Sequence, residues 1–217
     1  MSSFELHAEN ISKVFGRRLI FKDVDFSCKN NGIYGISGPN GSGKSTFLKI
    51  ISGIISPTKG KVTHSFDGKV VESEHLHNFL GFVAPYVILY DEFSAVENIH
   101  FFSKIRGINF TQEKFDFLFQ HFGLFDRKDD LVKGYSSGMK QRLKYIFALI
   151  HSPKILFFDE PTSNLDNSGK EKVYQTINEE SQNNIVIIAS NEDSDLAVCS
   201  TVLELKNYKI APKSENK

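Results

Sequence analysis

The chain has 217 residues, of which 40% are hydrophobic and 24% are charged, so its length and composition predict one globular domain and exclude a disordered chain or two separate enzymes. Its 26 basic and 26 acidic residues give a formal net charge of zero, which provides no global field to draw the chain to nucleic acid or to an anionic membrane. Two cysteines without a CxxC pair exclude a disulfide scaffold and favour a reducing compartment. The sequence has no run of about 18 apolar residues, so we expect membrane contact only through a partner.

The first part of the chain predicts strands around a glycine-rich loop. Polar and apolar residues roughly alternate over residues 4–10 and 19–28, with a turn at residues 15–18, which indicates an antiparallel hairpin. A short strand of the buried type is expected over residues 33–37. It leads into the glycine-rich loop, and a helix over residues 45–51 follows.

Helices and buried strands alternate in the rest of the chain. Apolar residues recur at spacings of three and four between residues 94 and 121, which predicts helical structure there. Two more helices are expected over residues 136–150 and 168–180, and two strands over residues 155–158 and 185–189. The tail predicts two short strands around residues 206–208 and a frayed end over residues 212–217. This alternation indicates an α/β fold with a mostly parallel core sheet.

The glycine-rich loop carries the strongest functional motif. It matches GxxxxGK[ST] between a strand and a helix, which is the context that a phosphate-binding loop requires. Its backbone amides would form a nest for phosphates, Lys44 would pair with β- and γ-phosphate oxygens, Ser45 would bind Mg²⁺ and Thr46 would contact the α-phosphate. The residues of the loop are Gly38, Pro39, Asn40, Gly41, Ser42, Gly43, Lys44, Ser45 and Thr46.

Two acids end the apolar strand that is predicted over residues 155–158. Asp159 stands where a P-loop nucleotide hydrolase needs a carboxylate for the Mg²⁺ site, and Glu160 could position the attacking water. A strand that ends in Asp-Glu is, by itself, more often just a solvated strand end. Because a phosphate loop lies upstream in this chain, a functional role for the two acids is favoured over a solvated strand end.

A third motif begins the helix at residues 136–150. Ser136 or Ser137 is suited to cap this helix, and the helix start offers a second anion site beside Gly138. In isolation the segment would be interpreted as ordinary capping. Its position before the Asp159 strand favours a functional role.

Taken in order, these motifs resemble the ATP-binding subunits of ABC transporters over nearly the whole chain. The resemblance implies a P-loop NTPase with an N-terminal antiparallel β subdomain and a helical subdomain inserted at about residues 87–150 of a single domain, 1–217. It also implies ATP and Mg²⁺ as ligands, Phe15 as the aromatic that stacks on adenine, and a head-to-tail dimer. In that dimer Ser137 and Gly138 contact the γ-phosphate held by the opposite subunit, and Asp166 is the acid of the D-loop.

Several positions depart from the pattern of that family. Asn191 stands where the family places a switch histidine, and an amide can neither carry charge nor shuttle a proton. Tyr86 stands where a glutamine usually reaches the Mg²⁺ or the attacking water, although its side chain could simply pack. The LSGGQ-like segment is altered as well, with Tyr135, Ser137 and Met139 in place of Leu, Gly and Gln. These changes bear on the rate of hydrolysis more than on nucleotide binding.

The segment from Tyr90 to Phe102 looks like the helical subdomain of short transporter ATPases and is similar to the haem-exporter ATPase of cytochrome c maturation. That resemblance implies a separate integral membrane permease as partner, a homodimer or heterodimer of ATP-binding subunits, and a place on the cytoplasmic face of the membrane. An amphipathic helix that simply faces solvent is the alternative for this segment. The side chains expected to dock are Phe82, Tyr86, Tyr90 and Phe93.

The leading hypothesis is an ATP-hydrolysing subunit that powers a permease. One alternative is a soluble ABC-type ATPase, although the chain lacks the second cassette, coiled-coil insert or basic patch that such proteins usually carry. A second is a slowly hydrolysing, nucleotide-gated regulatory subunit, which Tyr86 and Asn191 favour. A P-loop kinase comes third, because the motifs at residues 136–142 and 163–166 would then have no explanation. The transported substrate and its direction do not follow from the sequence.

Overall fold

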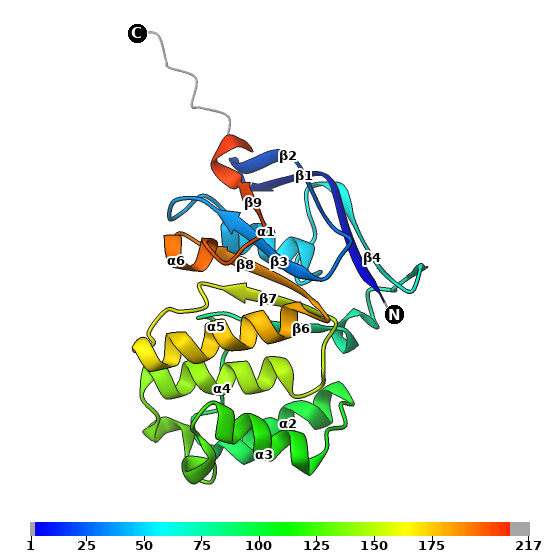
Figure 1. The fold of residues 1–217 in the computed structure, drawn as a ribbon. Helices are drawn as coiled ribbons and strands as arrows, with labels where there is room; N and C mark the ends of the chain where they lie inside the picture. Colours follow the sequence, from blue (N-terminus) through cyan, green and yellow to red (C-terminus); the bar gives the residue numbers. More distant parts are fainter. Residues whose placement is uncertain (1–2, 209–217) are drawn as a thin grey trace.

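The computed structural model describes residues 3–208, which form two sheets with helices packed against them (Figure 1). The first sheet is antiparallel, with strand order β2-β1-β4-β5, and the second is parallel, with order β6-β7-β8-β3-β9. The predicted α/β class and the N-terminal antiparallel hairpin are confirmed. The strands are β1 (Phe4–Phe15), β2 (Arg18–Cys28), β3 (Gly32–Ser37), β4 (Lys59–Phe66), β5 (Lys69–Val70), β6 (Leu80–Val83), β7 (Ile155–Asp159), β8 (Ile185–Ser190) and β9 (Thr201–Glu204).

The hydrophobic core has two parts, one on each face of the parallel sheet. Along β7, Ile155 and Phe157 pack toward α1 (Lys44–Ile51) and the antiparallel sheet, whereas Leu156 and Phe158 pack toward the other helices. Successive side chains of a strand point to opposite faces, so a strand covered on both sides is apolar throughout. This explains why β7 and β8 are unbroken runs of buried residues.

The helices beyond α1 lie on the second face of the sheet. They are α2 (Ala95–Arg106), α3 (Gln112–His121), α4 (Ser137–Leu149) and α5 (Asn167–Ser181), and the short α6 (Asp193–Leu196) follows β8. Figure 1 shows α2 and α3 at the end of the molecule opposite to the antiparallel sheet, beyond α4 and α5. The division into a core and a helical subdomain over residues 87–150 stays a prediction.

The structure corrects the prediction in the middle of the chain. The helical stretch expected over residues 94–121 is two helices, because Gly107 takes the left-handed conformation with φ of 64° and ends α2. A C-terminal glycine of this kind is a common helix stop. Strands β4, β5 and β6 were not predicted, and all three are short or rich in polar residues.

The tail is described as far as Tyr208. One strand, β9, is formed there among the described residues, and Leu205–Tyr208 is a 3-10 turn in which Leu205 is buried. The second strand predicted around residues 206–208 would follow this turn and lies outside the described residues. The frayed end predicted for residues 212–217 lies outside the described residues.

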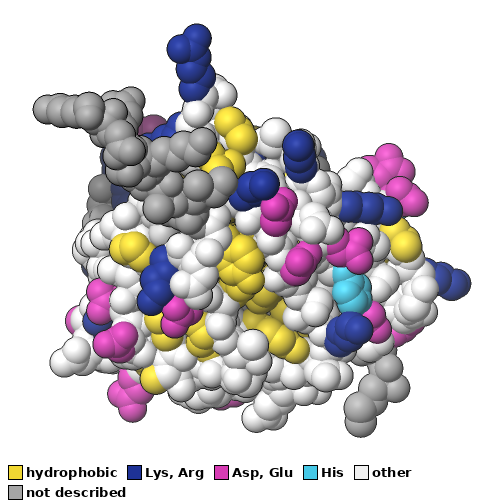
Figure 2. Space-filling model, turned by 90° about the horizontal axis from the view of Figure 1, so that it is seen from above, with side chains coloured by type: hydrophobic (Ala, Val, Ile, Leu, Met, Phe, Trp, Pro, Cys, Tyr) yellow, Lys and Arg dark blue, Asp and Glu magenta, His cyan; other side chains and the backbone are white. Residues whose placement is uncertain are grey.

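Charge is evenly mixed on the face of the molecule seen in Figure 2. Basic and acidic side chains are interspersed there, with apolar side chains between them. This pattern agrees with the formal net charge of zero.

Candidate nucleotide site

The phosphate loop lies between the end of β3 and the start of α1, at the carboxyl edge of the parallel sheet. Gly43 caps α1 with φ of 103°, and a Cβ atom on it would lie 2.5 Å from Ile20 Cγ2. Both its backbone conformation and its neighbour therefore require glycine. The amide of Ser42 donates to the Pro39 carbonyl at 3.0 Å, which closes the loop over the helix start.

Lys44 occupies the centre of this loop and is 5% exposed. Its Nζ donates to the Gly38 carbonyl at 2.9 Å and lies 3.3 Å from Oε1 of Glu160. The ammonium group is thus held inside the loop by a backbone oxygen and by the carboxylate of the residue that directly follows β7. These are the contacts that phosphate oxygens could replace.

Asp159 ends β7 and is 1% exposed. The hydroxyls of Ser45 and Tyr86 lie near its side chain, whereas its buried Oδ1 has no hydrogen-bond partner. Burial raises the pKa of the carboxyl above its usual value, and the nearby Ser45, Tyr86 and Lys44 oppose that rise. A buried carboxylate oxygen without a partner, beside a serine hydroxyl, fits a hard cation such as Mg²⁺.

Tyr86 does more than pack against its neighbours. Its hydroxyl lies near Asp159, and Nζ of Lys49 lies 3.7 Å from the centre of its ring. Burial, followed by the charge of Asp159, raises the pKa of the phenol, so the group remains a neutral donor. Tyr86, which stands at the glutamine position of the family, therefore lies beside Asp159, the carboxylate predicted to bind Mg²⁺.

Glu160 is the first residue after β7 and has an uncommon backbone conformation, with φ of 50°. Its amide donates to the Ala189 carbonyl at 2.8 Å, which extends the pairing with β8 by one residue. Its side chain lies between Lys44 on one side and the Ser190 hydroxyl, 3.3 Å from Oε2, on the other. The structure thus brings Lys44, Ser45, Asp159 and Glu160 to one place.

The remaining predicted residues lie on other surfaces. Ser136 caps α4 by accepting from the Met139 amide at 3.2 Å, and Asp166 caps α5 by accepting from the Gly169 amide at 2.8 Å. A Cβ atom on Gly138 would lie 3.3 Å from the Asn164 carbonyl, so the start of α4 lies against the turn before α5. Ser137 is exposed. Their contacts with nucleotide stay predictions.

Phe15 and Asn191 are also exposed. The Phe15 side chain ends β1, is 50% exposed, and has Nζ of Lys13 4.8 Å from its ring centre. Asn191 directly follows β8, at the carboxyl edge that also carries Glu160. Adenine stacking by Phe15 and a γ-phosphate contact from Asn191 stay predictions.

Sequence reasoning missed a hydrogen-bonded cluster behind Glu160. It joins the end of β8, the loop after β7, α5 and α6 through four side chains: Ser190, Asp195, Thr162 and Tyr174. Its members are 5 to 33 residues apart in the pairs that touch, so no local spacing could have revealed it. In the sequence, the residues Ser-Asn-Glu after the strand indicate a role for Asn191 only.

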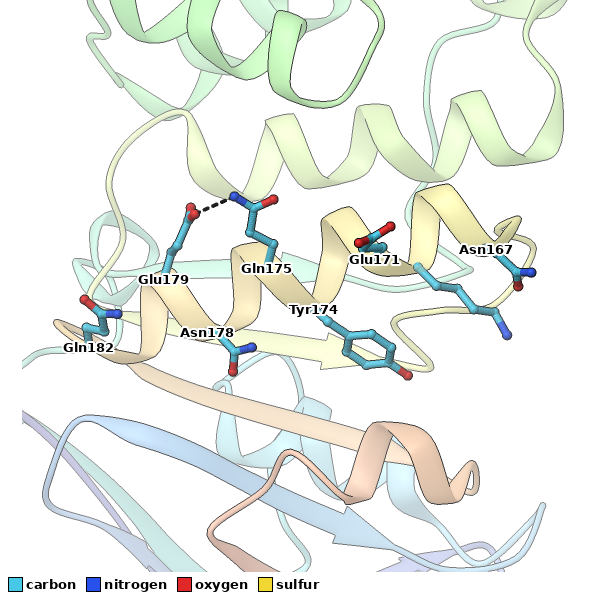
Figure 3. Close-up of a pocket in the computed structure, with 8 residues that line it drawn as sticks. Asn167, Glu171, Tyr174, Gln175, Asn178, Glu179 and Gln182 are labelled. Atoms are coloured by element: carbon cyan, nitrogen blue, oxygen red, sulfur yellow. Dashed lines mark hydrogen bonds between the residues drawn. The ribbon is translucent and has the colours of Figure 1, made fainter.

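A shallow hollow along α5 lies apart from this site (Figure 3). It has a volume of about 590 Å³ and is lined by side chains of one helix, including Asn167, Glu171, Tyr174 and Gln182. Figure 3 shows Gln175 and Glu179 paired with each other on its rim, by a hydrogen bond of 2.8 Å. None of the phosphate-loop residues lines it.

The parallel sheet, the phosphate loop at its carboxyl edge and the two acids Asp159 and Glu160 define a P-loop nucleotide-binding protein. The family model described as "ABC transporter" matches residues 21–163, which include the phosphate loop and both acids. The chain therefore belongs to the ABC transporter family, in the class of its ATP-binding proteins.

Curated relatives agree with this assignment. The chain is 33% identical to the linearmycin resistance ATP-binding protein LnrL of Bacillus subtilis, over 84% of this chain and 60% of that protein. It is 32% identical to the lantibiotic transport ATP-binding protein SrtF of Streptococcus pyogenes, over 86% of this chain and 79% of that protein. The chain thus spans 60% of the length of LnrL. The narrower similarity to haem-exporter ATPases stays a prediction.

Solved structures share the fold. A putative ABC transporter ATP-binding protein from Pyrococcus furiosus superposes with a TM-score of 0.79 at 22% identity, over 95% of this chain and 100% of that one. A bacterial Atm1-family ABC exporter with ATP bound superposes with a TM-score of 0.81 at 23% identity, over 96% of this chain and 38% of that one. Among residues 3–208, no helix has the length and hydropathy needed to cross a bilayer.

Proposed function

We propose that this chain binds and hydrolyses ATP and that it powers a separate membrane permease. The observation that carries the proposal is the meeting of Lys44, Asp159 and Glu160 at the carboxyl edge of the parallel sheet, with 3.3 Å between Lys44 Nζ and Glu160 Oε1. Phosphate binding, metal binding and water activation need these three chemical types within reach of one another.

The nucleotide is proposed to take over the contacts that Lys44 makes in the free chain. Lys44 leaves the Gly38 carbonyl and Glu160 for phosphate oxygens, which carry more negative charge than either partner. Ser45 and Asp159 would hold the Mg²⁺, whose bound charge offsets that of the phosphates. Glu160, released from Lys44, then faces the attacking water.

Hydrolysis follows from that arrangement. The oxygen of water forms a bond to the γ-phosphorus while the bond between this phosphorus and the bridging oxygen of ADP breaks, and Glu160 accepts the proton of the water. The products are ADP and inorganic phosphate. The positive φ of Glu160 directs its side chain back toward Lys44, which is the position that this role needs.

The exposed helix start at α4 supports a dimer as the active form. Ser137 is exposed at a helix N-terminus, where backbone amides are available to an anion. Phe15 offers a half-exposed ring for adenine. We infer that two chains, identical or different, enclose ATP between the phosphate loop of one and the α4 start of the other.

A cluster of aromatic rings supports a docking surface for the permease. Tyr90 and Phe101 are 52% and 38% exposed, and their rings and that of Phe93 lie within 5.2 to 5.6 Å of one another. The buried Asn98 side chain bonds to both the amide and the carbonyl of Tyr90 at 2.9 Å, so this surface is held rigidly. Phe82, in contrast, stacks on Phe157 of the core.

The proposed place of the protein is the cytoplasmic face of a membrane, reached through the permease. The names of the relatives LnrL and SrtF refer to linearmycin resistance and to lantibiotic transport. We therefore propose export of an antimicrobial compound as the class of task. A slowly hydrolysing regulatory subunit is the second candidate, because Asn191 takes the place of an imidazole and Tyr86 lies beside the carboxylate proposed to bind the metal.

The substitution Glu160→Gln tests the proposed hydrolysis. It keeps the size of the side chain but removes the proton acceptor, so we expect ATP affinity to stay within about threefold while turnover falls at least about 100-fold. Calorimetry with MgATP and a phosphate-release assay measure the two effects. Turnover that persists in the variant would rule out Glu160 as the base.

The same variant, carrying an affinity tag, tests the partner. Incubated with MgATP and detergent-solubilised membranes of the native organism, it should retain a multi-span protein in near-equal amount, identified by mass spectrometry. A matched Glu160→Gln, Tyr90→Ala, Phe101→Ala variant should bind ATP equally but lose that partner. Recovery of soluble proteins alone would favour a soluble ATPase.

A further inference from the structure

Asp195 is a fully buried carboxylate that accepts hydrogen bonds from three hydroxyl groups. Thr162 and Tyr174 donate to its Oδ1 at 3.0 and 2.7 Å, and Ser190 donates to its Oδ2 at 2.7 Å. Three hydroxyl donors on one carboxyl group fit the ionised form, which has only acceptor sites. The two oxygens therefore have different partners: Oδ2 accepts from Ser190, and Oδ1 accepts from Thr162 and Tyr174.

Ser190 stands between this carboxylate and the proposed base. Its hydroxyl is 2.7 Å from Asp195 Oδ2 and 3.3 Å from Glu160 Oε2, and it accepts a bond from the Glu192 amide at 3.1 Å. The hydroxyl has one proton for two carboxylates. The shorter contact has the usual length of an O–H···O bond and the longer one exceeds it, so the Ser190 hydroxyl donates to Asp195 and not to Glu160.

We propose that Asp195 is a positioning residue of the hydrolytic site, which keeps the Ser190 proton away from Glu160. This inference rests on the proposed ATP hydrolysis. Lys44 is the charged partner of Glu160, and nucleotide would draw that partner away. Because the Ser190 hydroxyl donates its hydrogen bond to Asp195, Glu160 then keeps both oxygens free to accept from water.

The geometry predicts an unusual effect of Asp195→Asn. The amide oxygen can remain at the position of Oδ1 and accept from Thr162 and Tyr174, which places the NH₂ group at Oδ2. The NH₂ group can only donate, so Ser190 must become the acceptor there. Its own proton is then directed at Glu160, ties up one carboxylate oxygen and weakens the base.

The experiment combines this variant with Ser190→Ala in a double-mutant cycle on the full chain. We expect Asp195→Asn to lower kcat about tenfold at unchanged KM and ATP affinity. Ser190→Ala removes the misdirected proton and should cost about twofold to threefold by itself. The double variant should recover to the level of Ser190→Ala, so the second substitution rescues the first.

Tyr174→Phe provides the matched control. It also removes a hydrogen bond from Asp195, but on Oδ1, and leaves the pairing of Oδ2 with Ser190 intact. Tyr174→Phe should lower the melting temperature. Adding Ser190→Ala to Tyr174→Phe should not restore any loss of kcat. A merely structural role of Asp195 predicts that the effects of all three substitutions simply add.

Each outcome bears on one claim. Additive losses in the double variant, or a raised KM for Asp195→Asn, overturn the positioning role. If Asp195→Asn does not fold, Ser190→Ala alone decides: a loss of about tenfold or more would show that Ser190 serves Glu160 directly, and would overturn the proposal as well. Wild-type protein that hydrolyses no ATP refutes the proposed function instead, whereas a fully active Glu160→Gln variant leaves that function standing and overturns the positioning role, because Glu160 would then not be the base.

Discussion

Two residues with separate expected roles neutralise each other in the free chain. Lys44 was assigned to phosphates and Glu160 to water, yet the two side chains form an ion pair with Lys44 almost fully buried. Phosphate oxygens are the natural competitors for that lysine. We therefore expect nucleotide binding to draw Lys44 away from Glu160, which leaves the Glu160 carboxylate free to act as the base.

Asn191 is the residue at which the sequence departs most clearly from an efficient hydrolase. It is exposed directly after Ser190, on the edge of the sheet that carries Glu160. We predict that Asn191→His raises kcat about tenfold, because an imidazole can carry charge and transfer a proton near the γ-phosphate. Steady-state phosphate release measures this effect, with Asn191→Gln as the control that changes size alone.

An unchanged kcat in the histidine variant, with ATP affinity preserved, would contradict the idea that Asn191 limits the rate. In that case Tyr86 would be the residue expected to limit the rate. It also differs from the family pattern, and its hydroxyl lies near Asp159.

At the scale of elements, one half-buried imidazole links the end of α4 to β6. His151 follows the end of α4, and its Nε2 lies 3.0 Å from the Leu80 carbonyl at the start of β6. Burial, followed by the charge of Arg106, lowers the pKa of His151 to about 4. The neutral ring donates to Leu80, and its buried Nδ1 has no hydrogen-bond partner among the described residues.

This arrangement predicts that His151 makes stability depend on pH in a defined window. The unfolded chain binds a proton at a pKa of about 6.5, above the folded value, so the contribution of the neutral ring is complete above pH 6.5 and is lost as the pH falls toward 4. We predict that His151→Gln, which keeps a donor for Leu80, is less stable than wild type at pH 7. That deficit should shrink by about 2 kcal/mol at pH 5.

Urea unfolding of both proteins at the two pH values measures the difference. The comparison cancels the other titrating groups, because they are shared by wild type and variant. Parallel losses of stability in the two proteins would show that the imidazole does not resist protonation in the fold.

The elements that could be predicted are those whose pattern is contiguous in the chain. β3, the phosphate loop and α1 form one unbroken signal, and β7 with its two acids forms another, so both parts of the site were expected from the sequence. β4 has only two hydrophobic residues, Val62 and Phe66, among glycine and polar or charged neighbours, and its pairing with β1 is visible only in three dimensions. The break at Gly107 lay within an apolar periodicity that continues on both sides.

The charged residues of the site could be predicted from the sequence, whereas the side chains that contact and position them could not. Tyr86 could be placed near the metal site only through a family pattern, and packing was the simpler interpretation. The bonds of Asp195 to Thr162 and Tyr174 span 33 and 21 residues, respectively, and depend on how α5 and α6 pack against β8. Such contacts leave no periodic trace in a sequence.

At the scale of the whole molecule, the phosphate loop and the α4 start are separate surfaces of one chain. Ser136 and Asp166 are both explained locally as helix caps, and neither touches Lys44. A second chain is the simplest way to bring an α4 start to the nucleotide. The account therefore depends on association that requires ATP, with the aromatic surface at Tyr90 left free for the permease.

The most direct test is the mass of Glu160→Gln protein in solution, measured by light scattering during gel filtration with and without MgATP. The account predicts the 24.6 kDa monomer without nucleotide and twice that mass with it. A Glu160→Gln, Ser137→Arg variant should bind ATP normally and stay monomeric, because the added side chain blocks only the partner's nucleotide. A protein that binds ATP with full affinity and remains a monomer would contradict the account.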